Sequence, residues 1–169
     1  TLVNDEMKID ENIYELLPKL KEMGIKFVVA SGRQYCSLLS DFQEHTKDVV
    51  LCSENGAFIV DDGQELYAGC MTKEQVKMSL DAAYAVEGIE PVVCAKYVTY
   101  TTSQEMADFL GSRKFKYKMA VVDDLYDIDE DIIKISMAVM NGEDNVQMFR
   151  KVRAALDESL NLVTSGPDC

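Results

Sequence analysis

Apolar residues in the first third of the chain follow the spacing of alternating helices and strands. Residues 13–20 place leucine and isoleucine at i, i+3, i+4 and i+7, which predicts a helix with one buried side. Residues 26–30 are a short apolar run, typical of a strand that is buried on both faces of a parallel sheet. A second helix is predicted over 35–42 and a second strand over 49–52. This order is that of a βαβ unit, so we expect the two strands to be parallel, with a right-handed crossover.

The pattern changes in the second third of the chain. Two short apolar runs, 57–60 and 65–68, flank the turn signal at 61–63 and predict an antiparallel hairpin. The elements predicted after it are a helix over 72–87 that begins with a Thr72/Gln75 capping box, one or two strands in 91–102, a helix over 103–112, an extended segment in 115–122, a strand over 132–140, a helix over 146–156 and a last strand over 160–164. The sequence therefore predicts an α/β portion over 1–60 and a mixed α+β portion over 64–165.

Two parallel strands cannot build the α/β portion by themselves, because a parallel sheet is normally wider and covered on both faces. The first predicted helix has no strand before it, and the chain stops in a turn-like stretch after the last predicted strand. We therefore expect further strands of this sheet before residue 1, after residue 169, or both.

The excess of acidic over basic residues limits the classes of molecule that we expect this protein to bind. With 30 acidic and 17 basic residues, the formal net charge is −13. This charge argues against nucleic acid as a partner, because neutralising phosphates needs a basic surface. A small phosphorylated molecule stays open, since one local anion site can overcome the overall field. No run of about 18 apolar residues predicts a membrane span, and no basic-then-apolar signal peptide opens the chain.

The cysteines and the single histidine show no pattern of catalysis or metal binding. The five cysteines are widely spaced without a CxxC pair, which predicts reduced thiols in a cytoplasmic protein rather than a disulfide framework or a zinc site. His45 lies in a polar stretch and is expected at the surface. The acidic pairs at 61–62 and 123–124 are expected to be solvated turns, because neither belongs to a calcium-loop pattern.

The sharpest local feature is the end of the first predicted strand, at Ser31-Gly32-Arg33. There a hydroxyl and free backbone N–H groups would meet at the carboxyl edge of a parallel sheet, beside the start of the next helix, which favours an anion. Glycine lets a phosphate oxygen approach the backbone closely. The alternative is a plain turn in which Ser31 caps the helix, and Arg33 could face either a ligand or solvent. Asn55-Gly56 follows the neighbouring strand, so it either lines the same edge or forms only a turn.

Four segments occur in a recognisable order and spacing: Thr1–Asn4, Lys21–Lys26, Val28–Arg33 and Ser53–Ala57. Together they resemble the Cof-type phosphatases of the haloacid dehalogenase-like superfamily, and the similarity covers residues 1–62. The resemblance implies an α/β fold made of part of a Rossmann-like parallel-sheet core and an inserted α+β cap domain. In that fold residues 1–62 would be the N-terminal part of the core, 63–165 the cap, and 166–169 the start of the return to the core.

The same resemblance implies an activity. It is Mg²⁺-dependent hydrolysis of a phosphomonoester through an aspartyl-phosphate, with a small phosphorylated metabolite, a sugar phosphate or a phosphorylated cofactor, as substrate. Ser31 would be the catalytic residue whose hydroxyl binds the transferring phosphoryl group, assisted by the N–H of Gly32. Arg33, Asn55 and Gly56 are candidate substrate-lining residues.

The other residues that the family needs are expected outside these 169 residues. Thr1 would match the threonine that closes the first motif, so the two aspartates of that motif would precede it. The family's lysine and its metal-binding aspartates would follow Cys169. Mg²⁺ is therefore predicted as a cofactor with no ligand in this chain, and the chain alone is expected to be inactive. Two other functions stay open: a phosphosugar mutase of the same superfamily, and a non-catalytic module that binds phosphate or another ligand. The sequence does not predict an oligomeric state.

Overall fold

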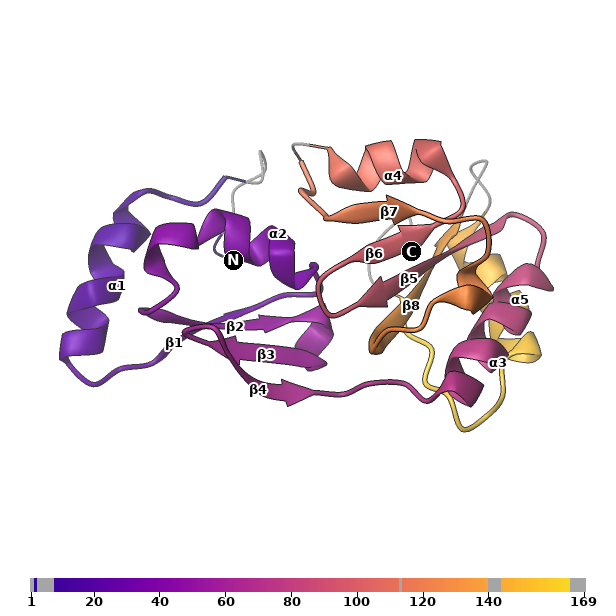
Figure 1. Ribbon diagram of the computed structural model, residues 1–169, viewed down its shortest axis with the longest axis horizontal. Coiled ribbons are helices and arrows are strands. Elements are labelled where there is room, and N and C mark those ends of the chain that lie inside the picture. The colour runs from indigo at the N-terminus through magenta and orange to yellow at the C-terminus, as the bar shows by residue number, and fades with distance from the viewer. Residues whose placement is uncertain (1, 3–7, 113, 140–143, 165–169) are drawn as a thin grey trace.

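The computed structural model describes residues 2, 8–112, 114–139 and 144–164, which form two units side by side (Figure 1). The first unit holds helices α1 and α2 with strands β1 to β4, and the second holds helices α3 to α5 with strands β5 to β8. Each unit is built around its own four-stranded sheet. The chain passes from the first unit to the second through residues 69–72.

The first sheet confirms the predicted parallel pair of strands and the hairpin. Its strands, in spatial order, are β1 (Phe27–Ala30), β2 (Val49–Ser53), β3 (Phe58–Asp61) and β4 (Gln64–Ala68). β1 and β2 are parallel, whereas β3 is antiparallel to both of its neighbours. Because β4 pairs with β3, the first sheet extends to Ala68, and the division that the sequence suggested after residue 62 falls inside the hairpin turn.

One apolar cluster holds the first unit together. Helices α1 (Asn12–Glu22) and α2 (Tyr35–Asp41) both contribute to it, for example through Leu17 and Leu38, and they pack on apolar residues of β1, β2 and β3. The expectation that β1 is buried on both faces is wrong, because Val28 is 52% exposed. Both helices share one cluster and so cover one face of β1, and among the described residues its outer edge pairs with no other strand.

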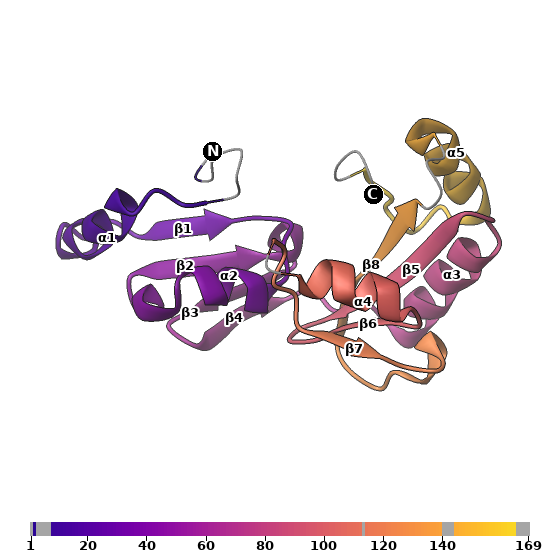
Figure 2. The ribbon, with the colours of Figure 1, turned by 90° about the horizontal axis from the view of Figure 1, so that it is seen from above.

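The second unit has the mixed architecture that the sequence predicted. Its strands, in spatial order, are β7 (Met119–Val121), β6 (Thr99–Thr101), β5 (Ile89–Ala95) and β8 (Ile132–Val139). Its helices are α3 (Lys73–Tyr84), α4 (Gln104–Gly111) and α5 (Asn145–Ala155). β5 is antiparallel to β6 and β8, and β6 is parallel to β7. α3 packs on β5 and β8 and touches α5, while α4 lies along β6 and β7 (Figure 2).

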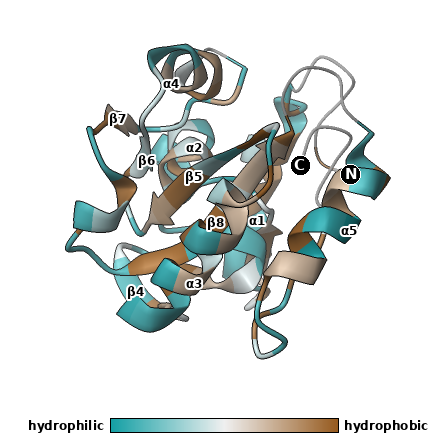
Figure 3. Cartoon of the chain, turned by 90° about the vertical axis from the view of Figure 1, so that its right-hand side faces the viewer, coloured by the Kyte–Doolittle hydropathy of each residue, from teal (hydrophilic) through white to brown (hydrophobic). Residues whose placement is uncertain are grey.

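Local signals set the starts of the helices in the second unit. Thr72 Oγ1 accepts a hydrogen bond from Gln75 N at 3.2 Å, and Gln75 Oε1 accepts one from Thr72 N at 2.8 Å. This is the predicted capping box. Ser103 and Asp144 cap α4 and α5 with their side-chain oxygens. Seen from the end of this unit, hydrophilic and hydrophobic residues alternate around α3 and α5, as expected for helices with one buried side (Figure 3).

The last predicted strand is absent from the described residues. Residues 161–164 have no regular secondary structure, although the apolar pattern suggested a strand. Leu160 is 9% exposed and packs against Ala82 of α3. The Arg153 guanidinium, from α5, donates a hydrogen bond to the Leu160 carbonyl at 2.7 Å. These contacts attach the segment to helices rather than to a sheet. The predicted return to the core over 166–169 lies outside the described residues.

The described cysteines are free thiols: Cys36, Cys52, Cys70 and Cys94. Cys169 lies outside the described residues. Burial raises the pKa of the Cys94 thiol to about 11, so this group stays protonated at neutral pH and packs as a small apolar side chain. Within the described part of the chain, no helix is long and apolar enough to cross a membrane.

Candidate functional site

Two loops meet where the parallel strands β1 and β2 end. One begins at Ser31, directly after β1, and the other is a short 3₁₀ turn over Glu54–Gly56, directly after β2. Ser31 N donates a hydrogen bond to the Cys52 carbonyl at 2.9 Å, and Asn55 N donates one to the Ser31 carbonyl at 3.1 Å. The loops thus extend the pairing of the two strands. Asn55 therefore lies beside Ser31 at the carboxyl edge of the sheet, which is one of the two arrangements that the sequence allowed.

Gly32 is packed against the other loop. A Cβ atom at this position would lie 2.5 Å from Oδ1 of Asn55, which is closer than real side chains approach. The sequence suggested that this glycine admits a phosphate oxygen, whereas in the structure the Asn55 side chain already requires it. Asn55 has a left-handed φ of 59°, which asparagine tolerates better than most residues. Gly56 completes the turn at a φ of 92°.

Ser31 and Gly32 present two hydrogen-bond donors at this corner. Ser31 Oγ accepts a hydrogen bond from Arg33 N at 3.2 Å, so its lone pair is engaged and its proton is free to be donated. Gly32 is exposed, and its N–H donates to no acceptor within the described residues. A pair of fixed donors at the end of a parallel strand suits an anion.

The start of α2 agrees with the apolar spacing, which predicts a helix over 35–42, but not with a helix that opens at Ser31 and Gly32. The helix begins at Tyr35, its N-cap is Gln34, and it is only 7 residues long. Ser31 is therefore not a helix cap, and the helix dipole does not supply the charge that the sequence analysis expected at Gly32. The intervening residues are used for other contacts, which explains why the helix starts later.

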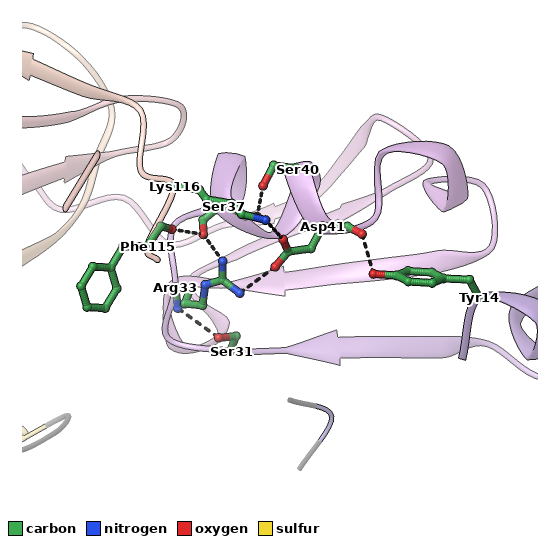
Figure 4. A network of polar contacts seen from close by, with 8 residues as sticks. All are labelled: Tyr14, Ser31, Arg33, Ser37, Ser40, Asp41, Phe115 and Lys116. Carbon is green, nitrogen blue, oxygen red and sulfur yellow. Dashed lines mark hydrogen bonds and ion pairs between the residues drawn. The ribbon is translucent and has the colours of Figure 1, made fainter. Parts of the chain in front are cut away.

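Arg33 is turned away from the corner (Figure 4). Its guanidinium donates to Asp41 Oδ2 at 2.8 Å and to the Ser37 hydroxyl, and the side chain is 16% exposed. Asp41 also pairs with Lys116 of the second unit. The structure thus gives Arg33 a role in holding α2 and joining the two units, in place of the substrate-lining role that the sequence had suggested.

Glu54 is an unusual residue beside this corner. It has a left-handed φ of 51°, which costs energy for a residue that is not glycine or asparagine. It is only 2% exposed, and Oε1 of its carboxylate accepts no hydrogen bond from the described residues. Its charge is balanced by an ion pair with Lys134 of β8. Sequence analysis missed Glu54, because nothing in the Ser53–Gly56 segment indicates that the carboxylate is buried.

Lys134 brings a cation from the second unit to the corner of the first. Its ammonium donates a hydrogen bond to the Gly32 carbonyl at 3.2 Å in addition to its ion pair with Glu54. Burial by itself lowers the pKa of Lys134, but Cys94 and Glu54 outweigh burial and hold that pKa above its usual value. At neutral pH the Cys94 thiol is uncharged, so the Glu54 carboxylate is the group that favours a charged Lys134 there. Sequence analysis missed Lys134, because it is a single charge within an apolar strand.

A cavity of about 140 Å³ opens next to the corner. Asn55 and Lys134 line it on the side of the loops, and Ser136, Met137, Phe149 and Asn161 line it farther along β8, α5 and the segment after α5. Ser31 and Gly32 do not line this cavity themselves. Asn55 and Lys134 connect the corner to the cavity, because both line the cavity and both contact Gly32.

Gln34 fastens the first unit to the second. It is fully buried, and its side-chain amide donates to Thr99 Oγ1 at 2.9 Å and to the Lys118 carbonyl at 3.1 Å. Its Oε1 accepts a hydrogen bond from Lys118 N at 2.7 Å. One side chain thus pairs with both backbone polar groups of Lys118, whose carbonyl also accepts a hydrogen bond from Thr99 N at 2.9 Å.

Gln34→Ala is expected to lower the free energy of unfolding by about 2 kcal/mol, because it leaves the Lys118 N–H without this partner and removes the hydrogen bond that Gln34 donates to the buried Thr99 Oγ1. Urea denaturation would measure the change. Gln43→Ala serves as the control, since Gln43 is exposed and should tolerate the substitution with little loss. Equal midpoints for the two variants would contradict the role assigned to Gln34.

Comparison with known proteins places these features in a family. The family described as haloacid dehalogenase-like hydrolases matches residues 1–169. The chain belongs to this family. It is 24% identical over 143 residues to the 5-amino-6-(5-phospho-D-ribitylamino)uracil phosphatase YbjI of Escherichia coli (strain K12), a match that covers 84% of this chain and 51% of that protein. The chain therefore spans about half the length of the curated relative.

Solved structures of the family have the same fold. A protein of Eubacterium rectale superposes with a TM-score of 0.82 at 20% identity, over 99% of this chain and 64% of the other. The HAD subclass IIB sugar phosphatase BT4131 superposes with a TM-score of 0.67 at 16% identity, over 92% of this chain and 60% of the other. At these identities the similarity shows that the haloacid dehalogenase-like chain shares a fold with them.

Proposed function

We propose that this chain supplies the phosphate-binding loop and the cap of a phosphomonoesterase. The first unit is the N-terminal part of a Rossmann-like core, and the second unit is the cap. The observation that carries the proposal is the pair of free donors, Ser31 Oγ–H and Gly32 N–H, at the edge where two parallel strands end.

The two donors act on the phosphoryl group directly. The Arg33 N–H fixes the Ser31 hydroxyl from one side, so its proton points away and is donated to one phosphoryl oxygen. The Gly32 N–H donates to a second oxygen. Both groups are held in place before the substrate arrives, so they stabilise charge on the phosphoryl oxygens in the transition state without further reorganisation.

The described residues do not fit a magnesium site. Among them no group of three or more His, Cys, Asp or Glu residues could hold a metal ion. The donors at the corner suit an anion rather than a cation. Mg²⁺ and the aspartate nucleophile stay predictions from the family resemblance, and that resemblance assigns their residues to positions before Thr1 and after Cys169.

The proposed substrate is the phosphate ester of a sugar or of a similar small polyol. By their names, the Escherichia coli relative acts on a phosphorylated ribitylamino-uracil and BT4131 is a sugar phosphatase. The cavity beside the corner holds about 140 Å³, below the roughly 300–1,000 Å³ typical of drug-sized ligands. Asn55, Ser136 and Asn161 offer it polar groups for hydroxyls, and Met137 and Phe149 offer an apolar wall.

Hydrolysis of p-nitrophenyl phosphate by the full-length protein is expected to need Mg²⁺ and to fall to background when EDTA removes it. The net charge of −13 repels an anionic substrate, so turnover depends on cations held close to the phosphate. Release of p-nitrophenolate measures the rate, and added Mg²⁺ should restore it.

The alternatives predict different results in the same assay. Phosphate binding without turnover at any Mg²⁺ concentration would favour a non-catalytic module. Formation of a phosphorylated product from a bisphosphate donor would favour a mutase.

A further inference from the structure

Two features of Glu54, its backbone conformation and its buried carboxylate, are energetically unfavourable. Its backbone is left-handed, and its carboxylate is buried, with no hydrogen bond to Oε1 within the described part of the chain. Structures keep such a residue when its surroundings or its function require it. Among the described residues, the charged group in contact with this carboxylate is the ammonium of Lys134, which lies 2.5 Å from Oε2 and belongs to the other unit.

Lys134 has spare capacity as a donor. Its ammonium carries three N–H groups. One donates to the Gly32 carbonyl, and the ammonium also pairs with the Glu54 carboxylate. The side chain is 24% exposed, and it lines the cavity together with Asn55. Lys134 therefore lies between the buried carboxylate, the donor corner and the space that a ligand would fill.

We propose that Lys134 binds the substrate phosphate from the cap, and that the Glu54 carboxylate pairs with the Lys134 ammonium in the free protein and competes with phosphate for it. This inference rests on the proposed function. In the free protein the carboxylate of Glu54 takes the place that an anionic ligand would have beside the ammonium. A bound phosphate then shares Lys134 with Glu54, and the second unit is drawn onto the first by the substrate itself.

Binding of inorganic phosphate to the full-length protein, measured by calorimetry in the presence of Mg²⁺, tests this directly. Lys134→Met keeps the length and apolar stem of the side chain but removes its charge, and we expect it to weaken phosphate binding at least about tenfold. Lys134→Arg restores a cation and should stay within about threefold of the original Kd. A Kd for Lys134→Met within twofold of the original would overturn the proposal.

Lys96→Met is the matched control. Lys96 also belongs to the second unit and pairs with a carboxylate of the first, Glu65, but that pair lies at β4, on the opposite edge of the first sheet from β1. A lysine that only joins the two units would behave like Lys96, with a lower melting temperature and an unchanged Kd for phosphate. The same result at Lys134 would overturn the inference.

The phosphate affinity of Glu54→Gln is a second test. It tests the proposal on its own if Lys134→Met does not fold. The amide no longer competes for the ammonium, so phosphate should bind severalfold more tightly. An unchanged or weaker affinity would overturn the proposed competition between Glu54 and phosphate for Lys134.

Parallel assays with p-nitrophenyl phosphate separate this inference from the proposed function. Phosphate binding that depends on Lys134 without any turnover would overturn the phosphatase and leave Lys134 as a ligand. Turnover of p-nitrophenyl phosphate, together with phosphate binding that does not depend on Lys134, would support the phosphatase and overturn the role proposed for Lys134.

Discussion

Ser31→Ala is expected to lower kcat for p-nitrophenyl phosphate by about 10²–10³-fold, because it removes one of two preorganised donors to the phosphoryl group. KM should change much less, since a donor aimed at charge that develops in the transition state contributes little to the ground state. Steady-state kinetics of the full-length protein with Mg²⁺ measures both constants.

Ser40→Ala is the control for this substitution. Ser40 is exposed on α2, and its hydroxyl donates to the Ser37 carbonyl, away from the corner. It loses the same atom as Ser31→Ala, and its kinetics should match those of the original protein. If Ser31→Ala also kept its kcat, Ser31 would no longer be a candidate catalytic residue, and the Gly32 N–H would remain as the one donor proposed.

Phe58→Ala is expected to lower the free energy of unfolding by about 3–5 kcal/mol, the range found when a large buried aromatic side chain is removed. Phe58 is fully buried, and its ring lies edge-on to Tyr35 at 5.3 Å and to Tyr97 at 5.6 Å between centroids. Tyr97 belongs to the second unit, so the cavity would open in the core and at the contact between the units. Urea denaturation followed by circular dichroism measures the loss.

Phe109→Ala provides the comparison for an exposed ring. Phe109 lies on α4 with 56% of its surface exposed, and its truncation should cost less than about 1 kcal/mol. Similar losses for the two variants would mean that the ring cluster of Tyr35, Phe58 and Tyr97 does not carry the stability assigned to it.

Much of the fold follows from signals that act over a few residues. The apolar spacing at 13–20 and 35–42 predicts α1 and α2, and the Thr72–Gln75 capping box predicts the start of α3, because these patterns depend on contacts within one helix. Ser31 and Asn55 could be predicted to share an edge, since parallel neighbouring strands end on the same side. That α2 does not open at Ser31 was not predictable, because its N-cap residue Gln34 bonds to Lys118, 84 residues away.

The part of the site that the sequence did not reveal is the part built between the two units. Glu54 and Lys134 are far apart in the chain, and each follows an ordinary local pattern, a turn and a strand. Only the packing of one unit on the other shows that they meet at Gly32. The absence of the strand predicted at 160–164 has a similar cause, because Leu160 packs in a cluster with Ala82 and Leu156, and no local pattern reveals these contacts.

The close fit between Gly32 and Asn55 also limits how this protein can change over time. Any side chain added at 32 meets the Asn55 amide, so a substitution there requires that amide to rotate away or position 55 to become smaller. Asn55 in turn needs a residue that accepts a left-handed backbone, and glycine accepts it most readily. In descendants of this sequence, the residues tolerated at one of these two positions therefore depend on the residue at the other.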